Sequence, residues 1–218
     1  DVQKIQAICQ KNAIRFRRVP NDVLDSHCRR EKERGGIANH QGILTRLTAT
    51  SFCPLETLIE AVNEAPLPII LALDQVQDPG NLGTLARTFF ILGGAGILIP
   101  THNSASLGPQ ARRTAAGALE MLPVSRVTNL ARALDSLEEA GFTLYGTDKS
   151  GPKTENAFTV EPDFPAVLVL GNEERGIRPE VLKRCSHLLT IPQKRTFDSF
   201  NVAQAGAILL GIISANRK

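Results

Sequence analysis

The sequence predicts an α/β fold in which helices cover both faces of a mostly parallel sheet. Three observations lead to this class. Short apolar runs alternate with segments of helical spacing from residue 67 to residue 218. Some of these runs, such as Ala166–Leu170, are apolar at every position, as is typical of parallel strands that are buried on both faces. A chain of 218 residues with 42% hydrophobic residues is also large enough to enclose such a core.

A small α/β domain is expected before this sheet, at residues 1–53. The apolar spacing predicts helices at Val2–Cys9 and Asn21–Cys28 and short strands at Ala13–Arg17 and Gly42–Ala49. Because no strand precedes the first helix to pair with the first expected strand, we expect that an N-terminal piece of this domain is missing. Residues 54–66 contain a short helical segment with a proline at either end, which predicts a linker.

Residues 67–218 are expected to form the larger domain. The expected strands are Ile69–Leu73, Ala95–Ile99, Leu122–Val127, Phe142–Thr147, Ala166–Leu170 and Leu188–Ile191. The expected helices are Leu82–Leu92, Pro109–Glu120, Asn129–Ala140 and Asn201–Ala215. The last helix is apolar almost all round, which is typical of a helix in a core or a subunit interface.

Basic residues are clustered, although the net charge is only +3. The clusters of interest are Arg29, Arg30, Lys32 and Arg34, in an expected exposed loop of residues 29–40, and the pair Arg112 and Arg113. Clustered positive charge suits a polyanionic partner such as RNA.

The composition argues against several other classes of protein. The four cysteines form no CxxC pair, so neither a zinc site nor a disulfide scaffold is indicated, and we expect no metal. No apolar run approaches the roughly 20 residues that cross a bilayer, so we expect no membrane partner. The N-terminus lacks a secretory pattern, so we expect a cytoplasmic protein, or an organellar matrix protein in a eukaryote.

Two loops follow expected strands near the carboxyl end of the chain, at Gly171–Gly176 and Pro192–Asn201. Ligands of open α/β sheets bind beyond the carboxyl ends of the strands, so these loops predict a pocket. The loop after the first strand of the larger domain has neither G-x-G-x-x-G nor the Gly-Lys-Ser/Thr of a P-loop, which argues against a dinucleotide.

Three segments, taken together, resemble the three motifs of the SpoU family. They are Leu73–Arg87, Leu168–Glu173 with Gly176, and Ile191–Pro192 followed by Ser199–Val202. The family consists of RNA ribose 2′-O-methyltransferases of the SPOUT class that use S-adenosylmethionine, and the resemblance covers roughly residues 67–218. Upstream, His40–Ile43 resembles the end of the ribosomal-protein-like RNA-binding domain that precedes the catalytic domain in many rRNA-directed members.

The resemblance implies a C-terminal trefoil knot, a homodimer and a cofactor held by the knotted loops. By motif match, Gly171, Ile191 and Phe200 fall where family members contact the cofactor, and Leu170 and Asn172 flank the first of these. Phe200 departs from the leucine that is usual at its position. Since phenylalanine is also apolar, we expect cofactor binding to persist with altered packing.

The same motifs assign Arg87, Asn81, Glu173, Ser199 and Asn201 to the reaction. A ribose hydroxyl is a weak nucleophile, so it must be aligned with the methyl donor and must lose its proton easily. We expect Arg87 to hold the phosphate beside the target ribose and to stabilise a developing alkoxide. An arginine side chain stays protonated in proteins, which argues against this arginine as a general base.

The other four residues have alternative roles. Asn81 is expected to cap a helix, to orient Arg87 or the RNA, or to do both. Glu173 is expected either to anchor the turn that follows it or to fix Arg87. Ser199 and Asn201 are expected to cap the last helix and to contact substrate or cofactor.

The expected function is 2′-O-methylation of a structured RNA, with large-subunit rRNA favoured because of the additional N-terminal domain. Two alternatives use the same reaction, namely tRNA modification and self-protection against a ribosome-targeting antibiotic. A third, of another class, is a non-catalytic RNA-binding factor for ribosome assembly. No motif identifies the modified nucleotide, because RNA shape and pocket detail determine that choice.

Overall fold

The computed structural model describes residues 2–33, 40–45, 51–149, 154–195 and 197–217. The chain divides into two compact units, residues 1–49 and 50–218.

The described part of the first unit contains two helices, α1 (Val2–Lys11) and α2 (Asn21–Glu33), and no strand. The strand predicted at residues 13–17 is therefore wrong, and residues 42–45 of the second predicted strand are also irregular, while residues 46–49 lie outside the described residues. A strand needs a neighbour that accepts and donates its backbone hydrogen bonds, and these apolar segments have none among the described residues. In its described part, the predicted small α/β domain is helical.

Helix α2 also corrects the prediction of a basic loop. It continues past the expected end at Cys28, so Arg29, Arg30 and Lys32 lie in a helix, and Arg34 lies outside the described residues. The segment Arg-Arg-Glu-Lys-Glu consists of good helix formers, which explains why the helix continues.

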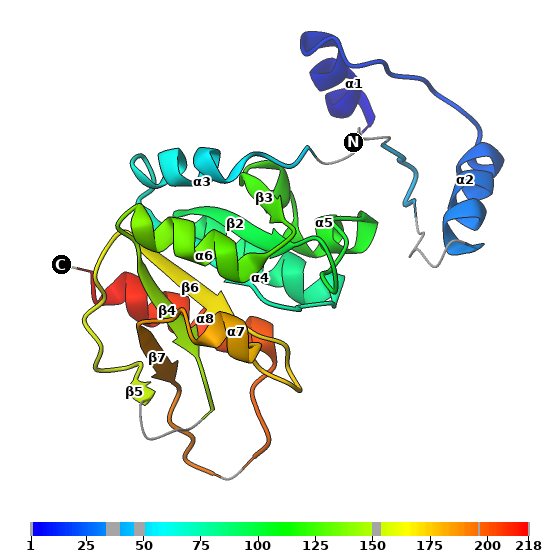
Figure 1. Ribbon diagram of the computed structural model, residues 1–218. Coiled ribbons are helices and arrows are strands. Elements are labelled where there is room, and N and C mark those ends of the chain that lie inside the picture. The colour runs from blue at the N-terminus through cyan, green and yellow to red at the C-terminus, as the bar shows by residue number, and fades with distance from the viewer. Residues whose placement is uncertain (1, 34–39, 46–50, 150–153, 196, 218) are drawn as a thin grey trace. The chain divides into compact units, whose positions relative to one another are not determined.

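The second unit is an α/β domain whose parallel sheet has seven described strands, in the order β3-β2-β1-β6-β4-β7-β5 (Figure 1). The strands are β1 (Leu67–Leu73), β2 (Gly94–Pro100), β3 (Val124–Val127), β4 (Thr143–Thr147), β5 (Thr154–Asn156), β6 (Ala166–Leu170) and β7 (His187–Thr190). All recorded strand pairings are parallel. The predicted fold class is confirmed. The trefoil knot stays a prediction.

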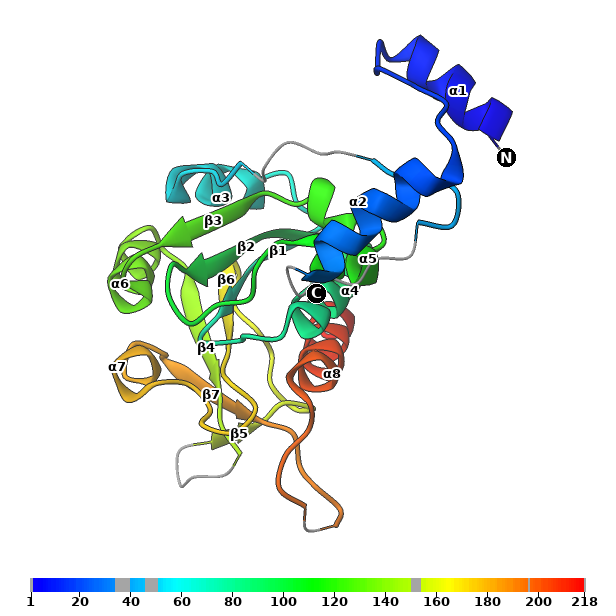
Figure 2. The same ribbon diagram turned by 90° about the vertical axis from the view of Figure 1, so that its right-hand side faces the viewer.

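Helices cover both faces of this sheet, as Figure 2 shows. The helices are α3 (Leu55–Val62), α4 (Pro79–Ile91), α5 (Pro109–Ala115), α6 (Leu130–Glu139), α7 (Pro179–Leu182) and α8 (Val202–Ala215). Helices α4, α5 and α8 share one apolar cluster with Ile69 and Leu71 of β1, whereas α3, α6 and α7 share another with Ile70 and Ala72. This alternation follows from the two-residue period of a strand, and it explains why the central strands β1 and β6 are apolar throughout.

The predicted helix Pro109–Glu120 is interrupted. Ala116 and Gly117 have φ angles of 50° and 95°, which end α5 and separate it from a short 3-10 helix, η1 (Ala118–Glu120). Glycine adopts such left-handed conformations without steric cost, so a pair of small residues here permits the break.

Helix α3 differs from the predicted linker at residues 54–66. Its Leu58 is fully buried, and the helix packs on β1, β2 and β3. The prolines mark the two ends of the helix. Its apolar face packs on the sheet because burial of that face is favourable. This segment therefore belongs to the second unit.

The order of the strands brings the ends of β1, β4, β6 and β7 together. Helix α8 packs closely against the end of β6 and against α4. A Cβ on Gly206 of α8 would come within 2.8 Å of Leu170 Cδ1 in β6 and within 2.4 Å of Leu85 Cδ2 in α4. In the part of the chain that the structure describes, no helix is long and apolar enough to cross a membrane.

Candidate functional site

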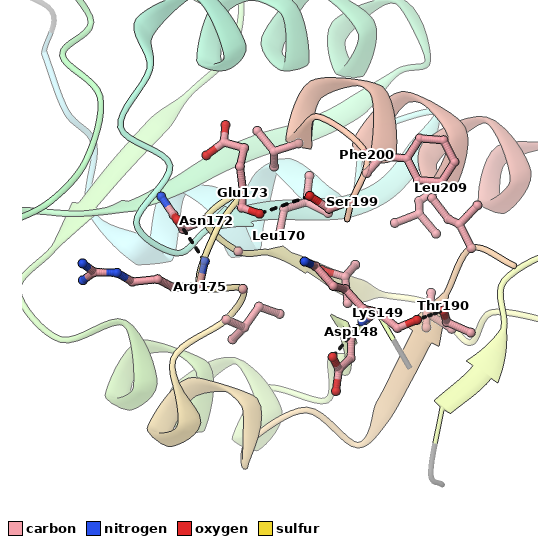
Figure 3. A pocket seen from close by; sticks show the side chains of 18 of the residues that line it. Asp148, Lys149, Leu170, Asn172, Glu173, Arg175, Thr190, Ser199, Phe200 and Leu209 are labelled. Carbon is pink, nitrogen blue, oxygen red and sulfur yellow. Dashed lines mark hydrogen bonds between the residues drawn. The ribbon is translucent and has the colours of Figure 1, made fainter. Parts of the chain in front are cut away.

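A cavity of about 290 Å³ opens where β4, β6 and β7 end and α8 begins (Figure 3). Many of the residues that the sequence assigned to a site line this cavity: Leu170, Gly171, Asn172, Glu173, Ile191, Ser199 and Phe200. The loops at Gly171–Gly176 and Pro192–Asn201 thus contribute to one pocket, as expected from the rule that loops at the carboxyl ends of parallel strands converge.

The turn after β6 folds back tightly on itself. The backbone amide of Asn172 donates to the carbonyl of Gly176 at 3.1 Å, and the amide of Gly176 donates in return at 2.9 Å. The side-chain oxygen of Asn172 accepts from the amides of Glu174 and Arg175 at 3.0 and 3.2 Å. A Cβ on Gly171 would lie only 2.3 Å from the backbone of Gly176 and Ile177, so glycine is required at this position.

A line of hydrogen bonds joins the three motif segments. Asn201 caps α8, because its Oδ1 accepts from the amides of Ala203 and Gln204 at 2.9 and 3.4 Å. Its Nδ2 is left to donate to Asn81 Oδ1 at 3.0 Å. With its oxygen used in this way, Asn81 directs its own Nδ2 to Glu173 Oε1 at 2.5 Å. The cap therefore fixes the orientation of the side-chain amides of Asn201 and Asn81.

Two further contacts refine the predicted roles. Ser199 Oγ donates to the backbone carbonyl of Glu173 at 3.3 Å, so this hydroxyl also supports the turn. Asn81 is not the cap of α4. Asp78 holds that position, and its Oδ1 accepts from the backbone amide of Asn81 at 2.7 Å. Pro79 occupies the first helical position, so the cap is the residue directly before it.

Arg87 lies on α4 with an exposed side chain and outside the cavity lining. Glu173 contacts Asn81 and does not pair with Arg87, so that predicted pairing is wrong. Among the described residues, Arg87 has no hydrogen bond and no ion pair. Its guanidinium is thus available to a partner outside this chain.

The end of β4 supplies site residues that the sequence analysis missed. Thr147, Asp148 and Lys149 line the cavity, and Thr190 Oγ1 donates to the carbonyl of Lys149 at 2.8 Å. In Figure 3, Lys149 and Thr190 lie across the cavity from the carboxylate of Glu173. These residues follow a predicted strand, so the rule that identified the other two loops could have identified them.

The lining combines apolar surface with charges of both signs. Ile191, Phe200 and Leu209 contribute apolar side chains, and Phe200 is 38% exposed. Asp148 and Glu173 contribute carboxylates. An apolar pocket with a few placed polar groups is the usual form of a small-molecule site.

None of the four cysteines lines the cavity. Burial, and to a lesser extent the negative charge of Asp74, raise the pKa of the Cys185 thiol to about 12, so it remains protonated at neutral pH. The four cysteines are free and half-buried. Within the described ranges, no three His, Cys, Asp or Glu side chains are grouped as metal ligands.

The two arginines of α5, Arg112 and Arg113, differ in their contacts. Arg112 pairs with Glu120, and its Nε donates to the carbonyl of Leu107 at 3.2 Å, so this arginine supports the fold. Arg113 is exposed.

Comparison with known proteins agrees with the resemblance in the sequence. Residues 68–211 match the model of the SpoU rRNA Methylase family. YacO of Bacillus subtilis (strain 168), a TrmH family protein, is 32% identical over 209 residues, which are 95% of this chain and 80% of YacO. A protein of Mycobacterium avium (strain 104), named as an uncharacterized tRNA/rRNA methyltransferase, is 35% identical over 179 residues, which are 82% of this chain but only 57% of that protein.

Solved structures share the fold of the second unit. The SpoU methyltransferase AviRb from Streptomyces viridochromogenes, in complex with the cofactor AdoMet, matches with a TM-score of 0.60 and 28% identity, over 67% of this chain and 56% of AviRb. The AdoMet-bound rRNA methyltransferase from Sinorhizobium meliloti matches with a TM-score of 0.66 and 26% identity, over 76% of this chain and 61% of that protein.

The close fit at Gly171 gives a direct test of the turn. We expect Gly171→Ala to destabilise the protein by about 1–3 kcal/mol, because the added methyl group would force the turn open. Thermal unfolding would measure the loss, and hydrogen exchange at the amides of Asn172 and Gly176 would locate it. Gly108→Ala is the control, because its Cβ meets only Ser106 Oγ at 3.3 Å. Equal unfolding temperatures for the two variants would contradict the geometry.

Proposed function

We propose, from the premise that the chain belongs to the SpoU rRNA Methylase family, that it methylates a ribose 2′-hydroxyl of structured RNA with S-adenosylmethionine as methyl donor. One observation carries the proposal. The predicted cofactor residues Leu170, Gly171, Asn172, Ile191 and Phe200 line a single cavity, which hydrogen bonds connect to the helix that presents Arg87.

The cavity has the chemistry that this cofactor needs. Its volume of about 290 Å³ is near the lower end of the range for ligand pockets, about 300–1,000 Å³. Ile191 and Phe200 offer apolar surface for an adenine ring, and the carboxylates of Asp148 and Glu173 favour the positive charges of a sulfonium and an ammonium group. When bound, S-adenosylmethionine supplies an electrophilic methyl group.

Arg87 is proposed to act on the RNA. Its exposed guanidinium can bind the phosphate beside the target ribose through paired hydrogen bonds. The same positive charge stabilises the alkoxide that develops as the hydroxyl loses its proton. The proton then passes to phosphate or water, because a guanidinium stays protonated in proteins and cannot accept it.

The remaining motif residues are proposed to position these parts. Asn201, Asn81 and Glu173 hold α4 against the turn after β6, and so they fix the helix of Arg87 relative to the cavity. Because these side chains already satisfy one another, their contribution is alignment of the two reactants.

The substrate is proposed to be rRNA. The Sinorhizobium meliloti structure is named an rRNA methyltransferase, and His40–Ile43 resembles part of an RNA-binding domain of rRNA-directed members. We propose that Arg29, Arg30, Lys32 and Arg34 of the first unit, together with Arg112 and Arg113, contribute phosphate contacts. Since Arg112 already pairs with Glu120, Arg113 is the better candidate of that pair.

A homodimer is proposed as the active form. Phe90 and Ile91 near the end of α4 are 39% and 71% exposed, and Met121, just after η1, is 67% exposed. Helix α4 packs beside η1, so apolar groups are exposed on adjacent elements. Burying such groups against a second copy would be favourable, and it would bring the partner close to the helix of Arg87.

Arg87→Ala separates the RNA role from the cofactor role. We expect methyl transfer to fall by about 10²–10³-fold while the Kd for S-adenosylmethionine stays unchanged, because the guanidinium acts on the RNA. Transfer of labelled methyl groups and calorimetry would measure the two quantities. Arg132→Ala is the control, since Arg132 is also exposed but lies on α6, on the other face of the sheet. A collapse of cofactor affinity in Arg87→Ala would contradict this role.

The substrate is tested by mapping 2′-O-methyl groups across total RNA from cells with and without the gene. We expect one rRNA position to lose its methyl group when the gene is removed. Loss at a tRNA position would instead support the tRNA alternative. RNA binding without any heat of S-adenosylmethionine binding would support the non-catalytic assembly factor.

A further inference from the structure

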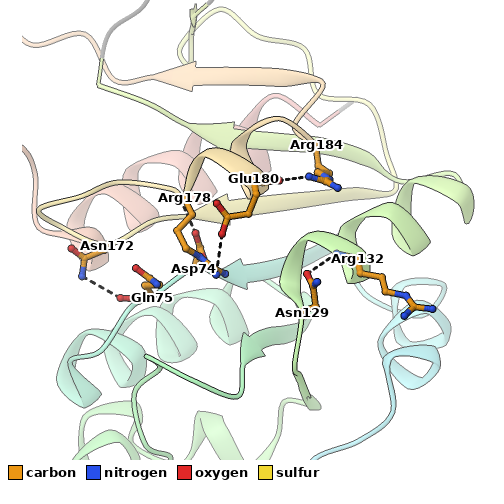
Figure 4. Close-up of polar contacts among 8 residues, drawn as sticks. All are labelled: Asp74, Gln75, Asn129, Arg132, Asn172, Arg178, Glu180 and Arg184. Carbon is orange, nitrogen blue, oxygen red and sulfur yellow. Dashed lines mark hydrogen bonds and ion pairs between the residues drawn. The ribbon is translucent and has the colours of Figure 1, made fainter.

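Asp74, at the end of β1 just beyond its last residue, is a carboxylate with no exposed surface. All its recorded side-chain hydrogen bonds come from one residue, Arg178 (Figure 4). The backbone amide of Arg178 donates to Oδ2 at 2.8 Å, and its Nε and Nη2 approach Oδ1 at 2.9 and 2.7 Å. The hydrogen bond to Asp74 is the main reason why the pKa of Arg178 is raised above its ordinary value.

The neighbouring residue, Gln75, holds the other end of the same turn. Its carbonyl accepts from Asn172 Nδ2 at 3.1 Å, and its φ of 61° lies in the left-handed region. Asp74 and Gln75 are adjacent in the chain, while Asn172 lies in the turn that lines the cavity and Arg178 directly follows Ile177, the last lining residue of this segment. A single dipeptide after β1 therefore fixes both ends of that turn.

Stability alone does not account for a charged pair at this position. Asp74 must leave water completely, while the side chain of Arg178 stays 33% exposed. Replacing a buried charged pair by apolar side chains of similar volume is often neutral or stabilising, because removing charge from water is costly. An apolar contact, however, has no direction. The guanidinium and the backbone amide of Arg178 both donate to the Asp74 carboxylate, which defines the position of this residue. Helix α7 begins at the next residue, Pro179.

We propose that Asp74 and Arg178 are positioning residues for the cofactor cavity. Their ion pair, with the Gln75–Asn172 hydrogen bond, sets the turn at residues 172–178 and thereby the affinity for the cofactor. The inference rests on the proposed function only in that it names S-adenosylmethionine as the ligand. Asp74 also leads into α4, so the same contact relates the turn to the helix that carries Arg87.

Arg178→Met, compared with Arg184→Met, tests the proposal. The side chain of Arg184 is 34% exposed against 33% for Arg178. Its Nε pairs with Asp135 at 3.0 Å, and its Nη1 donates to the carbonyl of Glu180 at 2.6 Å, in α7 and after the turn. We expect calorimetry to show that Arg178→Met raises the Kd for S-adenosylmethionine by at least about tenfold, since a small misplacement of a site is costly. Arg184→Met should leave this Kd unchanged.

A double variant distinguishes positioning from stability. Arg178→Met leaves Asp74 as a buried charge with one remaining donor, so its unfolding temperature should fall. Asp74→Asn/Arg178→Met removes that charge, and we expect the unfolding temperature to recover while the cofactor Kd stays raised. If the Kd recovers with the unfolding temperature, or if Arg178→Met never changes it, the proposal is overturned.

Failure of the proposed function would be recognised separately. A wild-type protein that gives no heat with S-adenosylmethionine would contradict the proposed function. Hydrogen exchange at the backbone amides of Asn172 and Gly176 tests the ion pair without any ligand. We expect these amides to exchange faster in Arg178→Met and not in Arg184→Met. Equal exchange in the two variants would overturn the role of the pair in holding the turn.

Discussion

The hydrogen bonds that run from Asn201 through Asn81 to Glu173 are the constraint on which the site depends. They begin at the cap of α8, where two backbone N–H groups need an acceptor. The side chain of Asn201 supplies that acceptor, and this fixes the orientation of its own side-chain amide and then of the Asn81 side-chain amide. The segments they join are far apart in the chain but meet where parallel strands end. One capping requirement thereby places a helix, a turn and a cavity in a fixed relation, which is what alignment of two reactants demands.

The contact between Asp74 and Arg178 performs a similar task on the other side of the turn. Both sets of contacts hold the segment after β6, one through two side-chain amides that end on the Glu173 carboxylate and one through the buried carboxylate of Asp74. The cavity wall is thus set by polar contacts with direction, while its surface toward a ligand remains partly apolar, through Ile191 and Phe200. We regard this division as the physical basis of the proposed activity.

Most of the larger fold could be predicted from the sequence, since its central strands β1 and β6 are apolar at every position and its helices have clear periodicity. The prediction failed for short or unpaired segments. Strand β5 and helix α7 are only three and four residues long, too short for a period to appear. In the site, motif order identified Gly171 and Glu173, but the cap at Asp78 and the pairing of Asp74 with Arg178 depend on local geometry and on residues 104 positions apart. No local pattern encodes a contact of that kind.

The central claim is that S-adenosylmethionine binds in the cavity between the turn after β6 and the loops that follow β4 and β7. Hydrogen exchange with and without S-adenosylmethionine tests it most directly. The account predicts that the cofactor slows exchange in residues 171–177, 147–149 and 189–195 and leaves α6 unchanged. Slower exchange elsewhere, with no change in those three segments, would contradict the account.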